Sequence, residues 1–144
     1  MARTHGRFGV VWLDDAAGTC RNLSGDINNV TFNRTKSPGE TTTFGDNSMQ
    51  REVDGLRDGS WDVSSIFNTN GSATAVVGIL DDLYVSSFMS RLKYLPAGSV
   101  SGSPIYEACV ALTSYNMAQP VDGIVTVNWS VALAAGSITG ACAV

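Results

Sequence analysis

The sequence contains few residues that could form a catalytic or metal site. Its single histidine, His5, lies near the start of the chain, where terminal segments are usually solvated. A Ser-His-Asp triad would have to recruit it, and no serine lies in a Gly-x-Ser-x-Gly motif. The cysteines Cys20, Cys109 and Cys142 form no Cys-x-x-Cys pair, so no zinc site is predicted. They could supply one disulfide and a spare thiol, but the usual behaviour of intracellular cysteines favours three free thiols packed as small hydrophobes.

Two pairs of adjacent carboxylates also have the wrong spacing for catalysis. They are Asp14-Asp15 and Asp81-Asp82. Neighbours on a strand point to opposite faces, and neighbours on a helix diverge by about 100°. Neither pair would converge on one substrate atom, so we expect solvated charges at a turn and at a helix end. Glycine-rich phosphate loops are also missing, and the pattern as a whole predicts no enzyme, no cofactor and no metal.

Composition predicts one strand-rich domain, residues 1–144, with a flexible N-terminal arm over residues 1–6. The chain has 144 residues, of which 44% are hydrophobic and only 15% charged, with 15 glycines. Its formal net charge of −4 does not favour a nucleic-acid-binding protein. No apolar run approaches the roughly 20 residues of a membrane helix, and the first residues do not form a signal peptide.

Alternating apolar and polar residues predict most of the elements. The expected fold class is mainly β, an antiparallel β-sandwich or barrel with one short flanking α-helix over residues 73–83. Pro120-Val121-Asp122-Gly123 is typical of a hairpin turn, and Trp12, Trp61 and Trp129 are expected in the core. The expected strands cover residues 8–13, 19–23, 27–34, 49–56, 60–68, 84–95, 105–119 and 125–133.

Residues 35–48 show no hydrophobic period. Their sequence is TKSPGETTTFGDNS, with Phe44 as the one core-sized side chain. A connection of this length inside a compact domain is either functional or disordered. Glu40 and Asp46 could bind a cation there, but their spacing matches no EF-hand loop. Asp58-Gly59 predicts a further turn.

Several turn and loop motifs, taken in order, resemble the tail tube (major tail) proteins of long-tailed bacteriophages. The resemblance covers residues 7–140. After an opening strand and its paired hairpin, an Asn-x-Val-x-Phe-x-Arg strand is followed by a Glu/Thr/Phe-Gly-Asp loop and a Gly-Leu-x-Asp-Gly turn. A strand and a short helix come next, and the chain ends on a Thr-Ser-Tyr segment, a Pro-Val-Asp-Gly turn and a last strand. These motifs occupy residues 28–34, 40–46, 55–59, 113–115 and 120–123.

The resemblance implies a structural role in the virion tail. Six copies would form a ring whose strands join into one β-barrel, and stacked rings would form a tube that conducts DNA during ejection. The implied partners are other copies of the chain, the tape measure, tail terminator and baseplate or tip proteins, and DNA in transient, non-specific passage. Assembly would occur in the host cytoplasm, without a membrane.

Three groups of residues become candidates for assembly. The first is a loop that clasps a neighbouring subunit or ring, although a flexible surface loop remains the alternative: Glu40, Thr41, Thr42, Thr43, Phe44, Gly45 and Asp46. The second is the turn motif Gly55, Leu56, Arg57, Asp58 and Gly59. The third is a lumen-lining or edge strand with small uncharged side chains, Thr126, Asn128 and Ser130, accompanied by Ser114 and Asn116.

Two other functions remain open from the sequence. One is a capsid decoration or tail-end protein of a virion. The other is a β-sandwich module that binds a carbohydrate or a host receptor, which would need exposed aromatic residues clustered with Asn, Asp or Arg. The aromatic residues here mostly occupy alternating strand positions, which disfavours the second function.

Overall fold

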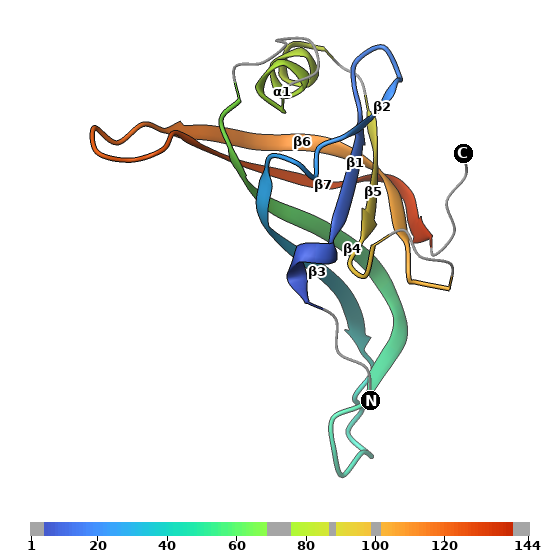
Figure 1. The fold of residues 1–144 in the computed structure, drawn as a ribbon. Coiled ribbons are helices and arrows are strands. Elements are labelled where there is room, and N and C mark those ends of the chain that lie inside the picture. The colour runs from blue at the N-terminus through green and yellow to red at the C-terminus, as the bar shows by residue number, and fades with distance from the viewer. Residues whose placement is uncertain (1–4, 69–75, 87–88, 99–101, 140–144) are drawn as a thin grey trace.

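Seven antiparallel strands form one sheet in the computed structural model, which describes residues 5–68, 76–86, 89–98 and 102–139 (Figure 1). The strand order is β2-β1-β5-β6-β7-β4-β3. The predicted fold class, mainly β with one short helix, is confirmed. The elements are the 3-10 turn Gly6–Phe8, β1 Val10–Asp14, β2 Cys20–Asn22, β3 Ile27–Glu40, β4 Arg51–Ile66, α1 Val76–Val85, β5 Ser90–Leu95, β6 Tyr106–Ala118 and β7 Thr126–Thr139.

The sheet curls so that strands far apart in its order meet across the core. Phe32 of the outer strand β3 stacks on Trp61 of β4, with 4.7 Å between ring centroids. The same Phe32 ring lies 6.0 Å from Tyr94 of β5 and 5.1 Å from Tyr106 of β6. These contacts cross the open side of the sheet, so apolar and aromatic burial holds the curl.

A buried polar pair lies in the middle of the core. The indole Nε1 of Trp129 donates to Ser65 Oγ at 3.2 Å, and Ser65 Oγ donates to the carbonyl of Val127 at 3.0 Å. Trp61 and Trp129 are fully buried, as predicted. The prediction is wrong for Trp12, which is half-buried on the opposite face of the sheet, beneath the Lys93 ammonium. Leu13, its neighbour in the strand, takes the core position because successive strand residues alternate between faces.

Helix α1 covers one end of the core. Val76, Ile79, Leu80 and Leu83 are its buried residues, at the spacing expected of one helix face. The predicted helix began at residue 73, and residues 73–75 lie outside the described part of the chain. The strand predicted from residue 84 is corrected, because Tyr84 and Val85 complete the helix and β5 starts at Ser90.

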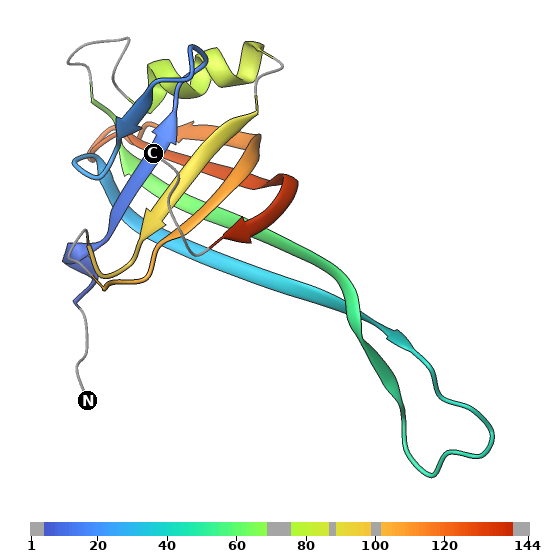
Figure 2. The ribbon, with the colours of Figure 1, turned by 90° about the vertical axis from the view of Figure 1, so that its right-hand side faces the viewer.

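The β3–β4 hairpin is longer than predicted and extends beyond the core as an arm, residues 34–57 (Figure 2). Residues 35–40 belong to β3, so the expected loop 35–48 reduces to the connection 41–50. The predicted turn Gly55–Gly59 is also wrong, because those residues continue β4, with Asp58 opposite Thr35 and Gly59 opposite Arg34. Cross-strand hydrogen bonding overrides the local turn preference of Asp-Gly, and both faces of the arm meet solvent, so no apolar alternation marks it.

The remaining sequence expectations concern the two ends and the second hairpin. His5 caps the turn Gly6–Phe8 by accepting a bond from the backbone N–H of Arg7, and residues 1–4 lie outside the description. The predicted turn at residues 120–123 is confirmed between β6 and β7, where Ala118 pairs with Thr126. Among the described residues, no helix has the length and apolar character needed to cross a membrane.

Candidate functional site

The outer side of four adjacent strands forms a surface of small polar side chains, which we call the polar face. It spans β6, β7, β4 and β3, on the side of the sheet opposite the buried tryptophans. A shallow hollow of about 230 Å³ lies over it. The side chains of the polar face are those of Asn29, Thr31, Asp62, Ser64, Ser114, Asn116, Asn128 and Ser130.

Strand register places these side chains in two rows that cross the sheet. In one row, Asn116 pairs with Asn128, which pairs with Ser64, which pairs with Asn29. In the other, Ser114 pairs with Ser130, Ser130 with Asp62, and Asp62 with Thr31. Alternate residues of each strand contribute to the face because strand side chains have a period of two.

Asp62 carries the one charge of the polar face. Its carboxylate accepts a hydrogen bond from the Ser130 hydroxyl at 2.7 Å and one from the Asn33 side-chain amide at 3.4 Å. These donors hold the carboxylate against the sheet while its exposed side still meets water. The face therefore offers hydrogen-bonding groups and negative charge, with no cation to bind a phosphate.

The sequence prediction identified part of this surface. Asn128 and Ser130 lie on it, and Thr126 starts the same face of β7, half-buried opposite Ile66. The possibility that β7 is an edge strand is wrong, because β7 lies between β6 and β4. Sequence reasoning did not assign the β3 and β4 members to the face, although the alternation of Asp62 and Ser64 with buried residues was the signal that could have found them.

The polar face ends at an unpaired strand edge on each side. β3 pairs only with β4 in the described chain, so its other edge is open. β6 pairs with β5 only up to Val110, opposite Ser90, whereas its pairing with β7 continues to Ala118. Within the part of the chain that the structure describes, residues 111–118 therefore present a second open edge. Unpaired backbone groups of this kind are sites where another strand can add.

The connection at the tip of the arm has a defined local structure. Thr41 N–H donates to the Gln50 carbonyl at 3.0 Å, and Gln50 N–H donates to the Thr42 hydroxyl at 2.9 Å. The Asp46 carboxylate accepts from Thr43 N–H at 2.7 Å, and Asp46 N–H donates to the Thr43 carbonyl at 3.1 Å, so the two residues close the turn. Asp46 thus has a structural partner at the position where a cation was considered.

The candidate clasp residues do not pack on the core of their own chain. Phe44 is fully exposed at the tip, and Met49 is also exposed. Glu40, the last residue of β3, faces Arg51 across the hairpin, a pairing of opposite charges that favours this register. The structure brings together the predicted loop residues at the far end of the arm, while Leu56, Arg57 and Asp58 lie along its length.

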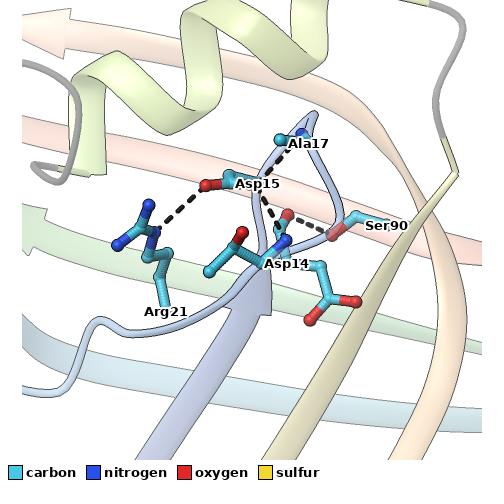
Figure 3. A network of polar contacts seen from close by, with 6 residues as sticks. Asp14, Asp15, Ala17, Arg21 and Ser90 are labelled. Carbon is cyan, nitrogen blue, oxygen red and sulfur yellow. Dashed lines mark hydrogen bonds and ion pairs between the residues drawn. The ribbon is translucent and has the colours of Figure 1, made fainter.

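The adjacent carboxylates Asp14 and Asp15, at the end of β1 and just after it, are buried structural groups (Figure 3). Asp15 accepts from Ala17 N–H at 3.0 Å and Thr19 N–H at 2.9 Å, and pairs with Arg21 Nε at 3.0 Å. The backbone bond from Thr19, followed by the Arg21 guanidinium, lowers the Asp15 pKa. The expectation of a solvated pair at this turn is corrected, because the carboxylate itself builds the β1–β2 turn together with the positive φ of Gly18.

Asp14 lies in a different environment from Asp15. Burial raises its pKa, against the lowering effect of Arg91, whose Nε is 3.8 Å from the Asp14 carboxylate. Arg91 also binds the buried Glu107 at 3.3 Å, and the backbone carbonyl of Asp14 accepts from the Ser90 hydroxyl at 2.7 Å. This cluster joins β1, β5 and β6. We assign it a structural role.

The described residues include no group of three or more His, Cys, Asp or Glu side chains that could hold a metal ion. Cys20 and Cys109 are thiols outside any disulfide, and both are exposed, so the expectation that they pack as small hydrophobes is wrong for these two. Cys20 is the first residue of β2, the strand at one end of the sheet, and Cys109 lies on the outer face of β6. These positions explain why both cysteines are exposed. Cys142 lies outside the described residues.

No protein-family model matches the sequence, and a search of curated proteins found no match. The tail of an empty gene transfer agent particle, solved with C6 symmetry, superposes with a TM-score of 0.78 at 14% identity, over 97% of this chain and 100% of that chain. The chain has the tail-tube fold.

Two further structures share this fold at low sequence identity. The SPP1 tail tube matches with a TM-score of 0.75 at 12% identity, over 96% of this chain and 80% of that chain. The sixfold-symmetrised baseplate of the anti-feeding prophage matches at 0.65 and 8% identity, over 91% of both chains. The sequence resemblance is thus confirmed for the tail-tube fold.

Proposed function

We propose that this chain is a structural virion protein that forms the tail tube of a phage-like particle. Copies associate side by side into hexameric rings, the rings stack into a hollow tube, and DNA passes through the lumen during ejection. In this role the chain has no catalytic function. The observation that carries the proposal is the four-stranded polar face bounded by an open strand edge on each side.

The polar face has the properties required of a lumen wall. DNA binding depends mainly on cationic side chains that neutralise phosphates. The polar face has none, and its one charged group is the Asp62 carboxylate. Small hydroxyl and amide side chains hold a layer of water, so a DNA duplex can pass without strong binding.

The open edges give a way to close a ring. If the free edge of β6 residues 111–118 pairs with the free edge of β3 in the next copy, four strands from each subunit continue into one barrel. The two edges differ, so the contact is heterologous, and such contacts close into rings when the rotation fits. Closure also removes the exposed edges that would otherwise promote aggregation.

The arm supplies a contact that the ring itself does not need. Its apolar tip residues Phe44 and Met49 are exposed in the isolated chain, where they oppose solubility. Residues 38–47 form the outer part of the arm and contribute nothing to the buried core. We therefore assign the arm to contacts between rings.

Deletion of residues 38–47 tests the proposal. The variant should keep the thermal unfolding and tryptophan fluorescence of the wild-type monomer, because Trp61 and Trp129 lie in the core. Negative-stain electron microscopy and sedimentation of the wild-type chain at high concentration should show hollow tubes with a bore near the width of duplex DNA. The deletion variant should form no tubes; normal tubes from this variant would refute the role of the arm.

A tail-end protein is the second candidate function. It is favoured by the similarity to the anti-feeding prophage baseplate. Such a protein would form single rings and stop. Rings without tubes at every concentration of the wild-type chain would therefore favour this function over the tail tube.

A further inference from the structure

One face of the arm carries a group of cations for which the described side chains provide no counter-charge. Lys36 lies directly opposite Arg57 in the β3–β4 ladder, and Arg34 is two residues before Lys36 on the same face. All three side chains are exposed, and none takes part in an ion pair within the described part of the chain. Like charges directly opposite each other destabilise a hairpin. The arm therefore carries an unfavourable charge pair that a partner could relieve.

The outer surface of helix α1 has the opposite character. Asp81 and Asp82 are exposed in its C-terminal half, and no basic residue lies in its last turn. Carboxylates at this end of a helix oppose the helix dipole. Tyr84 is 73% exposed and Val85 is 85% exposed beside them. The helix therefore presents an acidic and apolar surface, whereas the arm presents cations and the apolar tip residues Phe44 and Met49.

The two surfaces lie at opposite ends of the molecule. Figures 1 and 2 are related by rotation about the vertical axis, and α1 is at the top and the arm at the bottom of both views. Both surfaces also lie on the core side of the sheet. Lys36 and Arg57 continue the face of Phe32 and Trp61, and α1 contacts that side of β6 through Tyr115.

We propose that the cationic face of the arm docks on the outer surface of helix α1 in a second copy of this chain, in the next ring of the stack. The inference rests on the proposed function. Lys36 and Arg57 approach Asp82, and Phe44 and Met49 cover Tyr84 and Val85. Complementary surfaces at opposite ends of one molecule generate an open, head-to-tail series, which is the geometry of a growing tube.

The position of the cations favours a second copy over DNA as the occupant. The cationic face points away from the polar face, so the proposed lumen and the cations lie on opposite sides of the sheet. Binding of DNA to the arm is instead an outcome that the experiment can detect.

A charge exchange tests the docking. Arg57→Glu converts the like-charge pair with Lys36 into an attractive cross-strand pair, so the arm itself should stay folded. This variant and Asp82→Lys should each raise the protein concentration needed for tube formation by at least about tenfold, because like charges then meet at the contact. The double variant R57E/D82K should return that concentration close to the wild-type value.

Asp122→Lys is the matched control, since Asp122 is an exposed carboxylate on the β6–β7 turn. It should assemble like the wild type. Tubes from wild type, R57E and D82K at the same concentration would overturn the docking and leave the tail-tube function intact. If R57E assembled normally but no longer retained DNA, the cationic face would be a DNA-binding surface, and the docking on helix α1 would also be overturned. A wild-type chain that never forms tubes would count against both proposals.

Discussion

The stabilities contributed by the adjacent aspartates Asp14 and Asp15 should respond to pH in opposite directions. Asp15 accepts two backbone N–H bonds and one from Arg21, and these bonds lower its pKa from the ordinary value of 3.8. Burial raises the pKa of Asp14 above the same value. Asp15→Asn removes the charge from the hydrogen-bonded site, and Asp14→Asn removes it from the buried site. Both variants make the same substitution, so their effects can be compared directly.

The expected magnitude for Asp15→Asn follows from its partners. Hydrogen bonds to a charged group contribute about 1.5–3 kcal/mol each, but Asn can still accept from the two backbone N–H groups, so the loss is dominated by the Arg21 pair. The Arg21 side chain is 36% exposed, and solvent reduces its contribution. We expect the free energy of unfolding at pH 7 to fall by about 1–2 kcal/mol.

The two pKa shifts predict how the stability of each variant, relative to the wild type, changes with pH. The ionised Asp15 stabilises the fold at all pH values above 3.8, and this stabilisation is lost as the pH falls through its lower folded-state pKa. The difference in the free energy of unfolding between the wild type and Asp15→Asn should therefore become smaller in acid. Asp14 binds its proton more tightly in the folded state, so its ionisation opposes folding at neutral pH. Its contribution to the free energy of unfolding therefore becomes more favourable as the pH falls through its raised folded-state pKa toward 3.8.

Urea unfolding followed by tryptophan fluorescence, at protein concentrations where the chain is monomeric, measures both variants from pH 7 to pH 3. Asp14→Asn should be as stable as the wild type at pH 7, or more stable, while Asp15→Asn is less stable. The reasoning would be refuted if Asp14→Asn lowered the free energy of unfolding at pH 7 more than Asp15→Asn does. It would also be refuted if the difference in stability between the wild type and Asp15→Asn increased in acid.

Three further outcomes follow from the geometry. Ser65→Ala leaves the buried Trp129 Nε1 without its acceptor, and should lower the free energy of unfolding by about 1–3 kcal/mol in the same urea assay. Gly98→Ala should be more destabilising than Gly102→Ala, because both have positive φ but an added Cβ at Gly98 would lie 3.0 Å from a backbone oxygen, whereas Gly102 has open space; equal midpoints in thermal melts would contradict this. Asp62→Arg places a cation on the polar face, so assembled tubes should retain duplex DNA at low salt and release it as salt rises; filter binding at about 50 and 200 mM salt would show this, and retention independent of salt would contradict it.

The sequence alone determined the elements that are half-buried. Alternating apolar and polar residues identified β7 and the part of β4 around Trp61, because one face of each packs on the core and the other meets solvent. A mostly apolar run over residues 8–13 identified β1. The periodicity of Leu80 and Leu83 identified the helix for the same reason. The small polar residues of β7 were also visible in this alternation.

The tertiary structure decided the features that no local sequence pattern indicates. The arm has solvent on both faces, so β3 residues 35–40 and β4 residues 55–59 show no apolar period, and their strand pairing comes from cross-strand hydrogen bonds. Strand order is equally non-local: it places β7 in the interior of the sheet and joins polar side chains from four strands into one face. The environment of Asp14 likewise depends on β5 and β6, whose residues Arg91 and Glu107 lie far away in the sequence. Local preference sets which segments form strands, and long-range pairing sets which surfaces they build.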